Sequence, residues 1–370
     1  MPLDPRAVAL ILGCALATAA CSDPAPEPPA AASPVASPAP TPAQTDMPVV
    51  DAPPAVVAAS ASPQAQAIDA AIFDPAVTDP EAIKRAMTRA QILLDRAHMS
   101  PGVIDGRPGT NVTLALEAFQ AARGLPVNGK LDKVSWDALV AGDAGPVMTD
   151  YLITPEDVAG PFQPNIPKDD YEAMAKLPSL GYGTPLEALA ERFHMDEALL
   201  QALNPGVDFT AAGTAIVVAA AGPDRLAGKV ARIEIDKARG QVRVFDDKAV
   251  QLAVYPATVG STERPAPVGE WAVNTLAPNP TYTYDPSRLT FGKPKGKLTI
   301  QAGPNNPVGS TWIDLTKDTY GIHGTPDPKL VNKRASHGCV RLTNWDAAEL
   351  GAAVQKGAKV VFLGAETKAS

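Results

Sequence analysis

The sequence predicts a multidomain α+β protein with a small three-helix domain, a βααβ module and a mainly β, sandwich-like domain. First, the chain of 370 residues is too long for one ordinary core. Second, its apolar residues recur with helical spacing in the first two parts but alternate in the third. Third, joints rich in proline and glycine separate the parts. We place the parts at residues 80–142, 171–221 and 228–364.

The overall charge argues against a nucleic-acid partner. The formal net charge is −8, and the sequence contains no basic run. Binding to phosphates requires clustered lysine and arginine side chains, so we expect no nucleic acid among the partners. A substrate of neutral or mixed charge is easier to accommodate.

The N-terminus has the pattern of an export signal. An apolar run at 7–20 follows Arg6, and this run is too short to span a bilayer. It ends in small residues before Cys21, an order that resembles a bacterial lipoprotein processing site. We therefore expect residues 1–21 to be a signal peptide with Cys21 as the lipidated residue. The protein would then lie in the periplasm or cell envelope, attached to a membrane only through that lipid. A plain secretory signal cut near Ala20 is the alternative.

Residues 22–79 are predicted to form a disordered linker. The stretch 22–66 is dominated by proline, alanine and serine and has few large apolar side chains. Such a segment cannot bury enough apolar surface to offset the conformational entropy lost on folding. We interpret it as a tether that holds the folded parts away from a membrane.

The first folded part, 80–142, contains three expected helices. Apolar stripes predict helices around 83–94 and 114–119, and a third helix is expected at 134–140. The segment resembles the small peptidoglycan-binding domain, and the residues that carry the resemblance are Asp105-Gly106, Phe119-Gln120, Gly124-Leu125-Pro126-Val127, Gly129 and Trp136. The resemblance implies binding to peptidoglycan. Most of these residues are also the turns and core that such a fold needs, so a purely structural role stays open for them.

The second folded part, 171–221, resembles a LysM-like βααβ module. Leucines and aromatic residues at helical spacing predict two helices, around 186–193 and 199–203, and Asn204-Pro205-Gly206 ends the second helix. A closing strand is expected at 216–218, but the opening strand is hard to recognise. The resemblance implies binding to glycan strands, and a structural spacer is the alternative.

The third folded part, 228–364, is predicted to be mainly β. Alternation of apolar and polar residues at 231–236 and 241–244, with a turn between them, predicts a β-hairpin. A helix is expected at 345–354, and a last strand at 359–363. The further β-rich runs lie at 252–258, 270–274, 298–302 and 312–315.

The third part also holds the residues that could carry chemistry. Cys339 is the one cysteine outside the export segment, and His323 and His337 lie within 16 positions of it. An imidazole can take a thiol proton and stabilise the thiolate, which makes the sulfur a nucleophile. His337 would share a face with Cys339 in an extended segment, and His323 could approach through the turn at 324–328. The N–H groups of Gly338 and Cys339 could stabilise a developing oxyanion.

Arg341 offers a fixed cationic fork for a substrate carboxylate.

Residue types alone leave other interpretations of Cys339 and the histidines open. Zinc usually takes four ligands, and no further cysteine or closely spaced histidine is available, so we expect no metal. A buried inert thiol is the other interpretation of Cys339.

Two segments bear a specific family resemblance. His323-Gly324-Thr325 and the stretch from Ser336 to Arg341 are similar to the signature of the L,D-transpeptidase catalytic domain, the YkuD-like family. The resemblance implies that Cys339 is the acylated nucleophile. It also implies that His323 is the general base, oriented by a backbone carbonyl near Gly324.

The same resemblance implies the residues that bind substrate. The donor pocket would be lined by His337, Gly338 and Arg341, with further contacts from Ser336, Gly324 and Tyr320. A segment at 275–297 lies where the family has a loop over the cleft, and Tyr282 or Tyr284 could contact substrate from it.

The family implies acyl transfer without a cofactor or metal. The thiol would attack the amide after the third residue of a peptidoglycan tetrapeptide stem and release the terminal D-Ala. An amine of another stem would then give a 3–3 cross-link, an amine of an envelope protein would attach that protein to the wall, and water would make the enzyme a carboxypeptidase or amidase. The remaining alternatives are such a hydrolase on the same scaffold, or a non-catalytic peptidoglycan-binding lipoprotein.

Overall fold

The computed structural model describes residues 59–168, 170–260, 265–287, 296–333 and 338–365, all of which belong to one compact unit. The expected signal peptide, Cys21 and the linker as far as residue 58 lie outside these ranges. Within them, no helix combines the length and the apolar character needed to cross a membrane.

The N-terminal helical part forms as predicted. Its helices are α2 (Pro80–Arg96), α3 (Thr110–Ala122) and α4 (Lys133–Gly142). The carboxylates of Asp79 and Asp132 cap α2 and α4 by accepting hydrogen bonds from backbone N–H groups in the first turn. Trp136 is buried, as expected.

Two buried glutamines hold glycines that carry the resemblance to the peptidoglycan-binding domain. Gln91 Oε1 accepts from Gly106 N at 2.7 Å, and Gln120 Oε1 accepts from Gly129 N at 2.9 Å. Both glycines have positive φ, at +71° and +64°, which side chains with a Cβ rarely adopt. These residues therefore fix two turns of the domain.

The structure corrects the end of the expected linker. Residues within 59–79 include helix α1 (Pro63–Asp69), in which Ala65 and Ile68 are buried. These two residues lie three positions apart and so share one face of the helix, which packs on α2. Asp69 Oδ1 accepts from Val147 N at 2.7 Å and Met148 N at 3.0 Å, which ties the helix to the chain beyond α4.

The structure also corrects the start of the βααβ module. Its opening strand, β1 (Met148–Leu152), precedes the expected range of 171–221 and pairs antiparallel with β2 (Ala215–Ala219). The adjacent polar residues Thr149 and Asp150 interrupt β1 and hid the strand from a search for apolar runs. Among the described residues, four helices lie between the two strands, two more than the predicted βααβ order contains. The predicted pair corresponds to α7 (Pro185–Arg192) and α8 (Glu197–Leu203), and the additional helices are α5 (Pro155–Ala159) and α6 (Tyr171–Met174).

The first two parts share one hydrophobic core. Ile92 and Leu94 of α2 belong to the same buried cluster as Leu200 of α8 and Val218 of β2. Val254, from the third part, also contributes to this cluster. The three-helix domain and the βααβ module are therefore packed as one structural unit.

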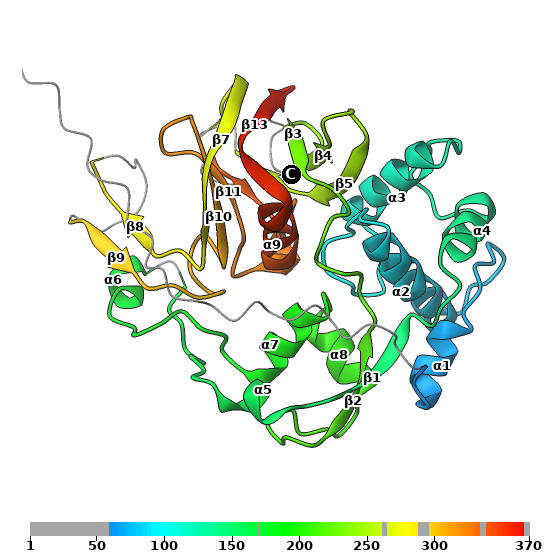
Figure 1. Cartoon of the computed structure of the whole chain (residues 1–370). Coiled ribbons are helices and arrows are strands. Elements are labelled where there is room, and N and C mark those ends of the chain that lie inside the picture. Colours follow the sequence, from blue (N-terminus) through cyan, green and yellow to red (C-terminus); the bar gives the residue numbers. More distant parts are fainter. Residues whose placement is uncertain (1–58, 169, 261–264, 288–295, 334–337, 366–370) are drawn as a thin grey trace, which may run out of the picture. The chain divides into compact units, whose positions relative to one another are not determined.

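The third part is mainly β, as predicted, and nine of its described strands form one hydrogen-bonded series. The strand order is β5-β4-β3-β13-β7-β10-β11-β12-β6 (Figure 1). The strands are β3 (Val230–Asp236), β4 (Gln241–Phe245), β5 (Gln251–Pro256), β6 (Thr258–Val259), β7 (Gly269–Pro278), β10 (Thr311–Leu315), β11 (Gly321–His323), β12 (Val340–Arg341) and β13 (Val354–Leu363).

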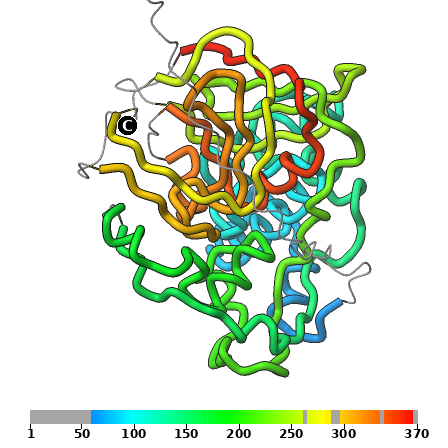
Figure 2. The backbone as a smooth tube through the Cα atoms, turned by 60° about the vertical axis from the view of Figure 1, so that its left-hand side comes forward, coloured from blue at the N-terminus to red at the C-terminus, as the bar shows by residue number. Residues whose placement is uncertain are grey.

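Strand β7 joins the two halves of this series. Its residues 269–272 pair with β13, and its residues 273–278 pair with β10. One long strand therefore carries the hydrogen bonding from one half of the sheet to the other. In Figure 2 the orange segments, which include the paired strands β10 and β11, lie side by side in the half of the sheet that begins at β7.

One core fills the β part. Side chains from both halves of the sheet, such as Ile233 and Ile313, belong to one buried cluster together with Leu350 of helix α9 (Asn344–Ala353). The 3₁₀ turn η1 (Pro328–Leu330) and a separate hairpin of β8 (Tyr282–Tyr284) and β9 (Leu298–Ile300) complete the described elements.

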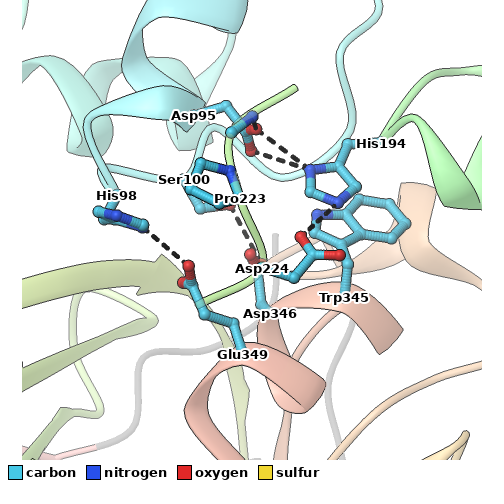
Figure 3. Close-up of a pocket in the computed structure, with 10 residues that line it drawn as sticks. Asp95, His98, Ser100, His194, Pro223, Asp224, Trp345, Asp346 and Glu349 are labelled. Carbon is cyan, nitrogen blue, oxygen red and sulfur yellow. Dashed lines mark hydrogen bonds and ion pairs between the residues drawn. The ribbon is translucent and has the colours of Figure 1, made fainter. Parts of the chain in front are cut away.

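A buried cluster of histidines and carboxylates joins the N-terminal part to α9 (Figure 3). His194, at the end of α7, stacks on Trp345 with ring centroids 4.9 Å apart. Its Nδ1 lies 3.1 Å from Asp95 and its Nε2 lies 3.1 Å from Asp224. The remaining polar members are His98, Ser100, Asp346 and Glu349.

Candidate active site

Strands β11 and β12 bring His323 and Arg341 to one face of the sheet, and Cys339 directly precedes β12. The strands are parallel, with Ile322 opposite Val340 and His323 opposite Arg341. Opposite residues of paired strands project to the same face, and so do residues two apart along one strand. His323 and Arg341 therefore share a face. Cys339 lies in the bend directly before β12, and Arg341 is close enough to affect the pKa of both Cys339 and His323.

The imidazole of His323 is held in one tautomer. Its Nδ1 lies 2.7 Å from the carbonyl oxygen of Gly324, which can only accept a hydrogen bond. The proton therefore lies on Nδ1, and Nε2 carries the lone pair. The ring is buried and stacks on Trp312 of β10, with centroids 5.5 Å apart and planes inclined by 20°.

Electrostatics keep this imidazole neutral. Burial and the neighbouring charge of Arg341 together lower the pKa of His323 to about 3, although the hydrogen bond to the Gly324 carbonyl acts in the opposite direction. A neutral ring with a lone pair on Nε2 has the form of a proton acceptor.

Cys339 is half-buried, and its Sγ lies 3.8 Å from the carbonyl oxygen of Thr319. Burial raises the pKa of the Cys339 thiol, while a backbone hydrogen bond from Gly321 and the charge of Arg341 act in the opposite direction. The net shift is upward, so the resting sulfur carries its proton near neutral pH. A base is then needed to make it a nucleophile.

Arg341 brings a positive charge into this site. Burial lowers its pKa, an effect that Tyr171, Cys339 and Asp327 oppose. Its Nε is buried and finds no acceptor within the described parts of the chain. Unsatisfied buried donors are rare in folded proteins, and this one is suited to an anionic substrate group.

The backbone at Gly338, next to Cys339, has a conformation that favours glycine. Gly338 has φ +109°, and a Cβ there would lie 3.0 Å from Cε1 of Tyr320. Tyr320 therefore lies against the backbone that leads to Cys339. Ser336 and His337, also predicted as site residues, lie in 334–337, outside the described residues.

Tyrosines from two parts of the chain meet beside the site. Tyr171 of α6 lies 5.8 Å from Tyr282 and 5.3 Å from Tyr284, measured between ring centroids. Burial raises the pKa of Tyr282, and Tyr171 and Cys339 contribute to this shift. Tyr282 and Tyr284 were suspected from the sequence. Tyr171 was missed because it lies more than 100 positions away in the chain.

Asn344 is a second residue that the sequence analysis missed. Its Oδ1 accepts hydrogen bonds from Ser310 N and Thr325 N, both at 3.1 Å, directly beyond His323. Thr343 caps α9 by accepting from Asp346 N, a local signal that marks the start of the helix. That signal does not reveal which loops Asn344 contacts.

Comparison with known proteins identifies the family. Residues 230–362 match the L,D-transpeptidase catalytic domain, and residues 85–139 match a peptidoglycan binding domain. The YkuD protein of Bacillus licheniformis, which carries an L,D-transpeptidase name, is 31% identical over 183 residues, or 48% of this chain and 93% of that protein. The chain belongs to the L,D-transpeptidase family, and it is an enzyme of this type with an N-terminal peptidoglycan-binding domain.

Other similar proteins carry the same family name. The L,D-transpeptidase YbiS of Escherichia coli is 28% identical over 200 residues, or 51% of this chain and 63% of that protein. Among solved structures, L,D-transpeptidase 3 from Mycobacterium tuberculosis is 18% identical, with 41% of this chain and 66% of that chain covered and a TM-score of 0.30. The chain thus spans about two thirds of these two relatives. The LysM-like resemblance of the βααβ module stays a prediction.

Proposed function

We propose that this enzyme uses Cys339 as nucleophile and His323 as general base to transfer an acyl group from a peptidoglycan tetrapeptide stem. The Nδ1 hydrogen bond from His323 to the Gly324 carbonyl carries the proposal. It leaves Nε2 as the proton acceptor, and the protonated thiol of Cys339 directly precedes the strand that pairs with the strand of His323.

The first half-reaction forms a thioester. The Cys339 proton passes to Nε2 of His323 as Sγ bonds to the carbonyl carbon after the third residue of the stem. The C–N bond then breaks, and the imidazolium returns its proton to the departing amine of D-Ala. The backbone N–H groups of Gly338 and Cys339 are candidates to stabilise the oxyanion, and Arg341 is suited to a carboxylate of the donor stem.

The second half-reaction releases the enzyme. An acceptor amine gives its proton to Nε2 and attacks the thioester carbonyl, so the C–S bond breaks and the sulfur recovers a proton. With an amine of a second stem, the product is a 3–3 cross-link. An amine of an envelope protein would anchor that protein to the wall, and water would give hydrolysis.

A covalent probe tests the residue assignment. The full chain is incubated with a carbapenem, whose strained amide a thiolate can open, and its intact mass and peptide masses are measured. We expect one added drug mass on the Cys339 peptide and none in Cys339→Ala. An adduct elsewhere, or full activity of Cys339→Ala on stem peptides, would refute the assignment. Parallel reactions with and without an added stem amine separate transfer from hydrolysis.

The proposal includes the site of action. A peptidoglycan substrate requires a position in the cell envelope, and we propose that a lipid on Cys21 holds the chain there. Metabolic labelling with a fatty acid should mark the wild type and leave Cys21→Ser unlabelled. Label on neither protein would support the plain secretory signal instead.

A further inference from the structure

A hydrogen-bonded chain leads from the βααβ module to the imidazole of His323. Gly324, whose carbonyl accepts from Nδ1 of His323, packs so tightly against Asn344 that a Cβ on Gly324 would lie 2.2 Å from Asn344 Oδ1. The same oxygen accepts from Thr325 N at 3.1 Å. The position of the Gly324 carbonyl is therefore set by the side-chain amide of Asn344.

The amide of Asn344 is itself fixed from outside the catalytic domain. Its Nδ2 donates to Glu191 Oε2 at 2.9 Å and to the carbonyl of Pro304 at 3.2 Å. Glu191 belongs to α7, well before the matched range of 230–362. Glu191 and Asn344 are only 7% and 5% exposed, so water does not easily replace either partner.

The contact also decides which way the amide points. Asn344 needs its oxygen toward Thr325 and its nitrogen toward an acceptor, and Glu191 supplies that acceptor. Without it, the buried amide nitrogen would keep one of its two partners, and rotation of the amide would place N–H groups against the N–H of Thr325. Such a rotation would displace the carbonyl that holds the His323 tautomer.

We propose that Glu191 is a positioning residue for acyl transfer, acting through Asn344 on the turn that orients the His323 imidazole. The inference rests on the proposed role of His323. It assigns the βααβ module a part in the catalytic unit, in addition to any binding of glycan. The catalytic domain alone would lack one of the groups that orient its base.

The test compares two glutamates of the same helix. Glu187 also makes a hydrogen bond to the catalytic domain, where its Oε1 accepts from Asn305 Nδ2 at 2.8 Å. Its hydrogen-bond partner there is Asn305 and not Asn344. The variants Glu191→Leu, Glu191→Gln and Glu187→Leu are prepared in the full chain. For each we measure the rate of acylation of Cys339 by a carbapenem at saturating concentration, the concentration for half-saturation, and the melting temperature.

We expect Glu191→Leu to lower the saturating acylation rate by about tenfold to 100-fold, the cost of a misplaced catalytic group, with little change in half-saturation. Glu191→Gln keeps an oxygen acceptor and should retain nearly the full rate. Glu187→Leu should lower the melting temperature without this loss of rate. An undiminished rate in folded Glu191→Leu, or an equal loss in Glu187→Leu, would overturn the proposal.

A second pair of variants applies if the leucine variant does not fold. Asn344→Asp keeps an oxygen for Thr325 but removes the donor to Glu191, and we expect about a tenfold loss of rate. Adding Glu191→Gln supplies a donor from the other side, so the double variant should recover most of this loss. A double variant no faster than Asn344→Asp would contradict the proposal. A wild type that is acylated at another residue would instead refute the proposed function itself.

Discussion

Two buried histidines of this enzyme have opposite electrostatic environments. Burial disfavours the charged form of both rings. At His194, the carboxylates of Asp95 and Asp224 overcome burial and raise the pKa well above its ordinary value. At His323, burial and Arg341 act together and lower the pKa to about 3. The sign of the nearest charge therefore separates a histidine that holds an ion pair from one that is suited to accept a proton.

Helix α9 connects the surroundings of the two histidines. Helix α9 begins at Asn344, beside the turn of His323, and its next residue, Trp345, stacks on His194. The comparison predicts that replacing His323 affects chemistry and replacing His194 affects stability.

The largest expected effect is on acylation in His323→Gln. Glutamine can keep a hydrogen bond to the Gly324 carbonyl but cannot take the proton of Cys339. General-base catalysis typically contributes about 10²–10⁴-fold, so we expect the acylation rate to fall by about 10³-fold while the melting temperature changes little. Stopped-flow measurement with a carbapenem checks the rate. A variant within tenfold of wild type would remove His323 from the role of base.

His194→Leu is expected to have the opposite profile. Removing the ring leaves the buried carboxylate of Asp95 without its partner, and breaking a buried ion pair typically costs about 3–5 kcal/mol. Urea denaturation should show a loss of about 3 kcal/mol, with the acylation rate of the folded protein within a few-fold of wild type. Unchanged stability would show that the ring is not charged in the folded state.

Local patterns in the sequence predicted helices and strands, but they did not predict contacts between residues far apart in the chain. Alternation in β3 and β4 and the helical stripes of α2 and α3 were readable because neighbours in the chain determine them. The pairing of Asn344 with Glu191 joins residues 153 positions apart, and the His194 cluster joins four separate segments. No spacing rule reveals such partners, because the fold alone brings them together.

The same limit applies within the candidate site. The motif around His323 and Cys339 was recognisable, and the carbonyl of Gly324 was expected as the orienting group. Trp312, which stacks on His323, was predicted only as part of a β-rich run, because the pairing of β10 with β11 sets that contact. The strand β1 was missed because Thr149 and Asp150 interrupt its apolar residues.

Stability should fall as pH rises through about 8. Burial raises the pKa of both Glu191 and Asp346 to about 8, so each holds a proton in the folded chain that the unfolded chain has already lost. The contribution of these two groups to the free energy of unfolding is complete at low pH. It is lost as the pH rises from their ordinary pKa to about 8. The slope is at most about 1.4 kcal/mol per pH unit for each group.

The matched variant for this pH effect is Asp346→Asn. It removes one titrating group from the buried cluster, so the decline of the free energy of unfolding between pH 6 and about 8 should be shallower than in wild type. His194, whose raised pKa acts in the same direction, keeps part of the slope. An unchanged slope in Asp346→Asn would show that this carboxyl group is already ionised in the folded chain.

The smallest expected effect is at Arg341. Arg341→Met removes a guanidinium suited to a donor carboxylate, so the KM for a stem peptide should rise by about tenfold. The same change removes the positive charge beside His323, so the pKa of His323 should increase. Steady-state kinetics and NMR titration measure the two effects. If the pKa of His323 is the same in Arg341→Met as in wild type, burial alone accounts for its low value.

The most direct test of the account is nitrogen NMR of the imidazole rings across pH 5 to 8. We expect His323 to remain neutral throughout, with its proton on Nδ1, while His194 remains charged. A His323 ring that titrates near pH 6.5, or that carries its proton on Nε2, would contradict the account.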